Sequence, residues 1–288
     1  MPRATLLATA SLALLLSPSA LRAETFHTCH GTIPSVPATI TTQGVWCLDR
    51  DFGTGLGSGA AIDIDTNNVT LDCNGFKLGN LAAGTGTGTV GIRALGRANV
   101  TIRNCNLRGF ARAIHLEGGI GGHVVEDNRI EAARMVAIAT LAGPATIRRN
   151  RIVDTGGSSV QTDAALAIGF EGSVEIVDNV IDGFVVPGDA VEFRPTGIKG
   201  VDDGQSRIQR NIVRGMATFD VLDAAMGIDV DGYGTIVSDN QLGGPGNDLG
   251  YGIRCLVGLQ TFVHGNIVAG FAEAVDFECI ADDNVVLP

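Results

Sequence analysis

Short stretches in which apolar and polar residues alternate recur along the chain, and most of them end in the same kind of turn. Residues 145–152 read apolar-x-apolar-x-x-Asn-x-apolar, and residues 174–181 repeat this order. Val, Ile and Thr at period two predict short β-strands rather than helices. The turn residue recurs at Asn74, Cys105, Asn128, Asn150, Asn179, Asn211, Asn240, Asn266 and Asn284.

The spacing of these turn residues predicts a solenoid. Successive markers lie between 18 and 32 residues apart, which leaves room for two or three strands in each repeat. A second signal, a Gly or Ala followed by Ile or Val, recurs at residues 91, 113, 137, 167, 197, 227, 252 and 274. One such repeat cannot bury its own apolar face, whereas coils stacked at about 4.8 Å can. We therefore expect an all-β, right-handed, single-stranded parallel β-helix whose turn asparagines hydrogen-bond to one another along the stack.

Two segments carry a resemblance to a known family. Residues 68–76 (NVTLDCNGF) and 99–111 (NVTIRNCNLRGFA) resemble the repeats of the pectate-lyase-like superfamily, and the similarity extends from about Ile40 to the C-terminus. The resemblance implies the parallel β-helix fold but no single activity, because the superfamily includes lyases, glycoside hydrolases, epimerases and sugar-binding proteins. Residues 200–203 (GVDD) match one polygalacturonase motif, but the accompanying motifs are missing, so no catalytic assignment is carried over.

The N-terminus has the pattern of a secretory signal peptide. Arg3 supplies a positive start, residues 4–16 form an apolar run too short to span a membrane, and residues 17–23 are mostly small. We expect cleavage after Ala23, a secreted or periplasmic location and no membrane insertion. The predicted organisation is a signal peptide over 1–23, an N-terminal cap and first coil over 24–60, and β-helix repeats over 61–288.

The charge of the chain limits its partners. The net charge of −11 becomes −13 when Arg3 and Arg22 leave with the signal peptide, which argues against nucleic acid and anionic membranes. A polysaccharide or cell-surface glycan is the expected partner, and the sequence leaves the oligomeric state open. Calcium is the one cofactor that stays open, since residues 243–251 match part of a calcium-binding nonapeptide repeat. A Gly/Pro/Asn turn is the favoured interpretation of that segment.

Six cysteines in an exported chain predict three disulfides rather than a metal site. Cys29 and Cys47 would close the N-terminal cap. Cys73 and Cys105 fall at nearly the same point of adjacent coils, within reach of a bridge. The remaining pair, Cys255 and Cys279, lies in the last two coils.

Candidate chemistry lies on the outer face of the predicted coil, because the inside is packed. If the Ile or Val of the second signal points inward, the next residue points outward. This aligns the candidate catalytic residues Lys199, Asp229, Arg254 and Asp276 in one column. Asp231 lies two positions further along its strand, and His115 and Glu117 occupy the corresponding columns several coils earlier.

Two interpretations of this column are open. A cross-strand salt-bridge ladder on a solvated face is favoured, because opposite charges on neighbouring strands are common. In the other, a polysaccharide lies in an exterior groove, Lys199 or Arg254 transfers a proton, and the acidic residues hold a cation or act as acid and base. Tyr233 and Tyr251 flank the region and are predicted to bind substrate together with Asp231. The expected function is carbohydrate interaction, with a lyase, hydrolase or epimerase reaction open; the alternative is a non-catalytic surface scaffold or adhesin.

Overall fold

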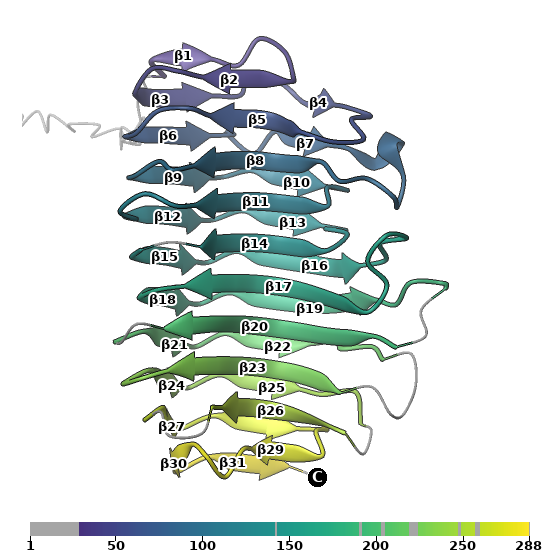
Figure 1. Cartoon of the computed structure of the whole chain (residues 1–288), viewed down its shortest axis with the longest axis vertical. Helices are drawn as coiled ribbons and strands as arrows, with labels where there is room; N and C mark the ends of the chain where they lie inside the picture. The colour runs from purple at the N-terminus through teal and green to yellow at the C-terminus, as the bar shows by residue number, and fades with distance from the viewer. Residues whose placement is uncertain are drawn as a thin grey trace, which may run out of the picture.

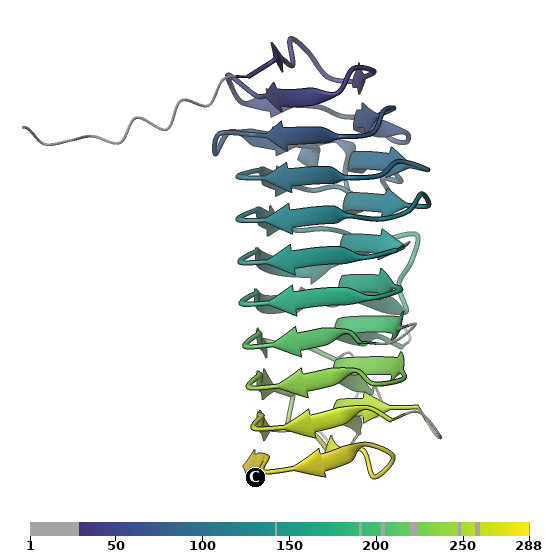
Figure 2. The same ribbon diagram turned by 90° about the vertical axis from the view of Figure 1, so that its left-hand side faces the viewer.

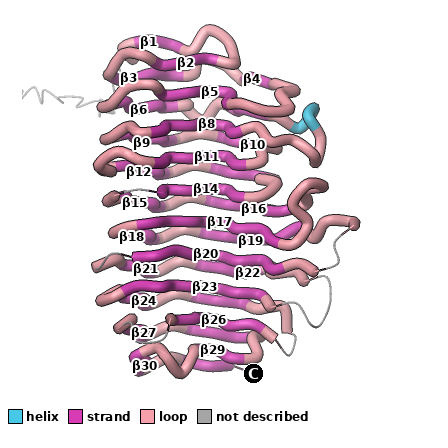
Figure 3. Tube along the Cα trace, in the orientation of Figure 1, coloured by secondary structure: helices cyan, strands magenta, loops and turns pink. Residues whose placement is uncertain are grey.

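The protein is an elongated parallel β-helix. The computed structural model describes residues 29–141, 143–189, 192–202, 205–218, 224–246, 249–256 and 260–287. Within these ranges the coils stack from an N-terminal to a C-terminal end (Figures 1 and 2), and the strands form parallel layers with loops at the corners (Figure 3). This confirms the predicted all-β solenoid. The predicted signal peptide lies outside the described residues.

Each full coil contributes one strand to each of three parallel sheets, which we call sheets A, B and C. Along the chain, the strands of one coil follow in the order B, A, C. Over the described residues sheet A has 11 strands and sheets B and C have 10 each. Sheet A consists of β1 (Gly31–Thr32), β3 (Gly44–Cys47), β6 (Val69–Asp72), β9 (Val100–Arg103), β12 (His123–Glu126), β15 (Ala145–Arg148), β18 (Val174–Val177), β21 (Arg207–Gln209), β24 (Ile236–Ser238), β27 (Phe262–His264) and β30 (Ile280–Asp282).

The other two sheets complete the coil. Sheet B consists of β2 (Ala38–Ile40), β5 (Ala60–Ile64), β8 (Val90–Leu95), β11 (Arg112–Glu117), β14 (Val136–Leu141), β17 (Ala164–Glu171), β20 (Arg194–Asp202), β23 (Ala225–Gly232), β26 (Gly250–Cys255) and β29 (Glu273–Val275). Sheet C consists of β4 (Phe52–Gly53), β7 (Lys77–Gly79), β10 (Asn106–Arg108), β13 (Arg129–Glu131), β16 (Arg151–Gly156), β19 (Val180–Val185), β22 (Ile212–Arg214), β25 (Gln241–Gly243), β28 (Ile267–Ala269) and β31 (Val285–Leu287).

Helical structure in the described residues is limited to the short 3-10 helix η1 (Leu81–Ala83). In that part of the chain, none of the helical structure has the length and apolar character needed to cross a membrane.

The Gly/Ala-Ile/Val signal marks where two sheets meet inside the coil. Ile198, Ile228 and Ile253 pair directly on adjacent strands of sheet B and are fully buried. A Cβ on Gly197, one position earlier, would lie 2.5 Å from the carbonyl oxygen of Gly227 on the next strand and 2.7 Å from a methyl group of Val213 in sheet C. Glycine is therefore required at this position because the backbone of the neighbouring coil and a side chain of sheet C fill the space.

The predicted asparagine ladder runs through the turns between sheets A and C. The side-chain amide of Asn128 donates to Oδ1 of Asn150, at 3.0 Å. The same contact continues from coil to coil as far as Asn284. Because the ladder residues up to Asn266 are at most 2% exposed, each amide satisfies polar groups that water cannot reach.

Asn74 was wrongly assigned to this ladder. The turn that follows β6 holds four residues, 73–76, whereas the turn after β9 holds only residues 104 and 105. The longer turn places Asn74 on the surface at φ 51°, where its amide donates to the Leu48 carbonyl. Cys105 occupies the ladder position instead, and its backbone N–H donates to Oδ1 of Asn128.

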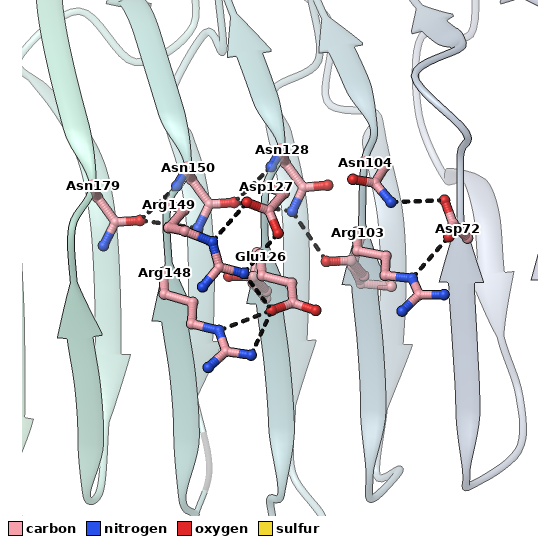
Figure 4. A network of polar contacts seen from close by, with 12 residues as sticks. Asp72, Arg103, Asn104, Glu126, Asp127, Asn128, Arg148, Arg149, Asn150 and Asn179 are labelled. Carbon is pink, nitrogen blue, oxygen red and sulfur yellow. Dashed lines mark hydrogen bonds and ion pairs between the residues drawn. The ribbon is translucent and has the colours of Figure 1, made fainter. Parts of the chain in front are cut away.

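The residue before each ladder asparagine adopts a left-handed conformation, and from Asp127 to Asp239 these residues alternate in charge. Asp127, Arg149, Asp178 and Arg210 have φ between 53° and 58°, and Arg149 binds Asp127 at 2.7 Å (Figure 4). The hydrogen bond from Arg149 lowers the pKa of Asp127. These pairs are exposed, so each contributes only about 0–1 kcal/mol.

The three predicted disulfides are present. Cys29 bonds to Cys47 at the N-terminal end, Cys73 to Cys105 between adjacent coils, and Cys255 to Cys279 in the last two coils. No free cysteine occurs among the described residues. The bridges therefore reinforce both ends of the stack and the coil where the asparagine ladder begins.

Candidate functional site

The outer face of sheet B carries a column of residues that we call the charged column. It comprises Asp63, Arg93, His115, Ala139, Gly169, Lys199, Asp229 and Arg254, paired in that order on successive strands. Asp276 follows the last strand, and its backbone N–H donates to the Ile253 carbonyl at 2.9 Å. Lys199, Asp229 and Arg254 thus lie side by side, the alignment that the sequence predicts. Ala139 and Gly169 separate them from His115.

Asp229 is held by a cation on each neighbouring strand. Its Oδ2 lies 3.0 Å from Nζ of Lys199, and its Oδ1 accepts a hydrogen bond from Nε of Arg254 at 2.7 Å. Although it faces outward, Asp229 is only 1% exposed. This corrects the expectation of a freely solvated ladder: the two long side chains cover the carboxylate. Both oxygens of Asp229 are engaged, so it is a structural brace rather than a free acid or base.

The charges around this brace reinforce one another. Burial opposes the charge of Arg254 most strongly, but the hydrogen bonds to Asp229 and the negative charges of Asp229, Asp231 and Asp276 together outweigh it and raise the pKa of the guanidinium. Asp276 is 8% exposed and adds a further negative charge beside Arg254. Its Oδ1 accepts a hydrogen bond from the backbone of Glu278, at 3.2 Å.

Asp231 differs from the other carboxylates of this face. Burial raises its pKa and the nearby charge of Asp229 raises it further, against the opposite effect of Arg254 and Lys199. Its Oδ1 is buried and has no hydrogen-bond partner among the described residues. A carboxyl group in such surroundings keeps its proton to a higher pH than usual, which suits a proton donor.

A groove of about 560 Å³ lies on the opposite side of the charged column from Asp231; we call it the sheet B groove. Its apolar lining includes Val136, Leu166 and Met226, which pair in one column of sheet B through Thr196. Its remaining lining is largely polar or charged: Gln161, Asp163, Glu192, Arg194, Lys199 and Arg254.

Four polar residues of the groove lie just before β17 and β20 or at the start of β20, and none of them was predicted as a site residue from the sequence. Gln161 and Asp163 lie before β17, and Glu192 and Arg194 lie at the start of β20. These strands extend further toward their N-termini than β14 does, so Ala164 pairs with Arg194. The sequence signal that could have indicated them is the longer spacing between Asn150, Asn179 and Asn211. This spacing indicates longer loops but does not show where in the coil the additional residues lie.

The two predicted substrate-binding tyrosines lie apart. Tyr251 pairs with Met226 and so continues the apolar column of the groove. Tyr233 is 59% exposed and follows the far end of β23, beyond Asp231. Of the two, Tyr251 is the one placed beside the sheet B groove.

The described residues contain no group of three or more His, Cys, Asp or Glu side chains placed to hold a metal ion. Asn247 and Asp248, from the segment that resembles a calcium repeat, lie outside the described residues, as does Asp203.

The comparisons with known proteins agree with this architecture. A family model described as "Right handed beta helix region" matches residues 60–242. The chain belongs to this family. The match also supports the predicted handedness of the coil. No curated protein matches the chain at a significant level.

Solved structures with a similar fold are tailspike proteins of the E. coli bacteriophage HK620. One, in complex with a pentasaccharide, is 12% identical, with a TM-score of 0.49 over 90% of this chain and 56% of its own. A mutant in complex with a hexasaccharide is also 12% identical, with a TM-score of 0.47 over 89% and 53%. The chain spans about half the length of these tailspikes. At this identity the likeness concerns the fold alone.

Proposed function

We propose that this is an exported carbohydrate-binding protein and that a glycan lies in the sheet B groove. The observation that carries the proposal is the lining of the groove. An apolar strip of Val136, Leu166 and Met226 faces an open space of about 560 Å³, and polar side chains border it. Sugar rings present apolar C–H faces and polar hydroxyl edges, so this combination matches their chemistry.

The polar border offers both kinds of hydrogen-bonding partner. Asp163 and Glu192 accept hydrogen bonds from sugar hydroxyls, whereas Arg194 and Lys199 donate them. Glu192 forms an ion pair with Arg194, and both side chains remain more than half exposed, so their other hydrogen-bonding positions are open to a ligand. The mixed charges favour a glycan with many hydroxyl groups over a densely anionic polymer, in keeping with the negative charge of the chain.

Export is the second part of the proposal. It is supported by the signal-like residues 1–23 and by three disulfides, which persist outside the reducing cytoplasm. N-terminal sequencing of the protein recovered from medium or periplasm should begin at Glu24. An intact Met1 in the mature protein would contradict export through this segment.

A catalytic role is the second candidate function, and Asp231 is the observation that favours it. Its raised pKa and its buried, unpaired oxygen suit a general acid in a lyase, hydrolase or epimerase. Asp229 is less suited, because Lys199 and Arg254 occupy both of its oxygens. A scaffold or adhesin without catalysis would need only the stacked coils and the brace around Asp229.

A panel of polysaccharides, tested with and without calcium, distinguishes these functions. Binding is measured by calorimetry, and cleavage or epimerisation by analysis of the products. Arg194→Ala, in the groove, should weaken binding about tenfold, whereas Arg93→Ala, on the same face but several coils away, should not. Asp231→Asn should abolish turnover if the protein is an enzyme. Absence of binding across the panel, or equal loss with both arginine variants, would contradict the proposed site.

A further inference from the structure

A second depression, of about 410 Å³, lies on the outer face of sheet C beside η1, the short helix in Figure 3. We call it the sheet C pocket. Two of its lining residues, Gly53 on β4 and Gly79 on β7, pair directly, and Arg108 on β10 follows them in the same column. A Cβ on Gly53 would meet no atom within 4 Å beyond its chain neighbours. The pocket is therefore open where the next coil carries a long side chain.

One wall of the sheet C pocket is apolar and is held from two sides. Leu81 and Ala82 of η1 form this wall, and Leu81 is 42% exposed. The backbone of Leu81 lies against Gly109, where a Cβ would come within 2.9 Å of the Leu81 nitrogen. The fully buried Asn80 donates its side-chain amide to the Leu56 carbonyl at 3.0 Å. Because these contacts fix the wall in advance, binding a ligand there costs little ordering entropy.

The two charged residues that line the sheet C pocket are both cations, Lys77 and Arg108. Nε of Arg108 lies 3.6 Å from Glu131. Glu131, however, accepts a hydrogen bond from Nε of Arg129 at 2.6 Å. The terminal N–H groups of Arg108 are therefore free to donate to another acceptor.

Lys77 is also only loosely paired. Its Nζ lies 3.4 Å from Oδ2 of Asp51, and the two side chains are 48% and 57% exposed. Asp51 is anchored separately, because its Oδ1 accepts the backbone N–H of Lys77 at 2.8 Å. The ammonium group can thus turn toward a ligand without breaking this backbone contact.

A third cation adds to the positive charge of this region. Burial lowers the pKa of Arg134, and the charge of nearby Arg108 lowers it further. The Nε of Arg134 is buried and has no hydrogen-bond partner among the described residues. In a chain of net charge −11, this part of the surface therefore attracts anions locally.

We propose that the sheet C pocket binds a small organic anion that carries a carboxylate or phosphate group on a compact apolar body. The oxyanion would accept hydrogen bonds from Arg108 and Lys77, since a guanidinium and an ammonium both suit such oxygens. The apolar body would rest on Leu81, above the glycine floor. The pocket shares no lining residue with the sheet B groove, so this ligand is additional to the proposed glycan.

The test titrates the full chain, in phosphate-free buffer, with phenyl phosphate, benzoate and the neutral analogue benzamide. Ligand-observed NMR should show saturable binding of at least one anion and binding of benzamide at least about tenfold weaker. The anion that binds more tightly identifies which oxyanion the pocket prefers. Arg108→Gln and Lys77→Met should each weaken binding of that anion by about tenfold. Both residues are exposed, so the fold is retained, which circular dichroism checks.

A further variant tests the space itself. Gly53→Leu fills the floor without changing any charge and should abolish binding of the anion. Gly243→Leu is its control, because Gly243 lies on β25 of the same sheet, where a Cβ would make ordinary contact at 3.7 Å. This control should bind as the wild type does.

Arg151→Gln is the matched control for Arg108→Gln. Arg151 lies on the same sheet, its side chain is 48% exposed against 49% for Arg108, and its nearest acid, Asp182, is likewise 3.6 Å away. Its loss should leave anion binding unchanged. Equal loss of binding with the controls, benzamide binding as tightly as the anions, or binding of neither anion would each overturn the proposal.

Discussion

Asn150 donates twice to the same oxygen of Asn179: its backbone N–H and its side-chain amide both lie 3.0 Å from Oδ1. The amide of Asn179 in turn donates to Oδ1 of Asn211, at 3.0 Å. One side chain therefore satisfies polar groups of two neighbouring coils. Because this relationship repeats along the stack, the asparagine ladder is a chain of buried, mutually dependent hydrogen bonds.

Replacing Asn179 by alanine should lower the free energy of unfolding by about 1–3 kcal/mol, since the buried backbone N–H and side-chain amide of Asn150 lose the oxygen that accepts from them and Asn211 loses one of its two donors. The measurement is the midpoint of urea denaturation. Asn106→Ala, on the outer face of sheet C, is the matched control and should have little effect. Equal midpoints for Asn179→Ala and the wild type would show that the ladder does not carry this stability.

Two aspartates of the charged column should respond differently to the same substitution. Asp229 is buried between Lys199 and Arg254, so Asp229→Asn should cost about 1–3 kcal/mol. Asp63 and Arg93 form a pair whose side chains are 32% and 31% exposed, so Asp63→Asn should cost about 0–1 kcal/mol. Denaturation of both variants measures the difference. A larger loss for Asp63→Asn would contradict the role of Asp229 as a buried brace.

His123 should make stability depend on pH. It is 1% exposed, and burial lowers its pKa below the ordinary value of 6.5. Below this value the unfolded chain binds a proton that the folded chain excludes. Stability should therefore fall as the pH drops below 6.5.

The variant His123→Val isolates this contribution, because the buried apolar residues Val100 and Ala145 flank the site in the same inward column of sheet A. The loss of stability between about pH 8 and about pH 5.5 should be smaller in the variant than in the wild type. An identical pH dependence in the two proteins would show that His123 does not couple folding to protonation.

Peptide mapping of the unreduced protein should recover Cys73 linked to Cys105, with Cys29–Cys47 and Cys255–Cys279 as the other bridges. The reason is proximity: the Cα atoms of Cys73 and Cys105 lie 4.6 Å apart, within the range of disulfides. Recovery of any of these residues as a free thiol in the native protein would count against the pairing.

The fold was predictable because one repeat pattern serves every coil. The inward Ile of the second signal fixes the register of sheet B, and with it the alignment of Lys199, Asp229 and Arg254. Asn74 shows the limit of such counting. Two additional residues in its turn move it out of the ladder, and the sequence spacing alone does not reveal which turn absorbs an insertion.

The candidate site was less predictable, for two physical reasons. The burial of Asp229 depends on how Lys199 and Arg254 fold over it, and a strand pattern gives no information on side-chain conformation. Asp163 and Glu192 reach the groove from segments between sheets C and B, where loop length varies between coils and the repeat imposes no constraint. The alternating charges from Asp127 to Asp239, in contrast, are visible in the sequence one position before the ladder asparagines, although they were not predicted.

Binding of the best polysaccharide ligand to Leu166→Glu and Leu95→Glu tests the central claim most directly. Both leucines lie on sheet B, but Leu166 lines the groove, whereas Leu95 is 43% exposed several coils away. A carboxylate at Leu166 removes the apolar surface on which a sugar ring would rest. Calorimetry should show affinity reduced by at least about tenfold for Leu166→Glu and unchanged for Leu95→Glu. Undiminished affinity in Leu166→Glu, with the fold intact, would contradict a glycan site in the sheet B groove.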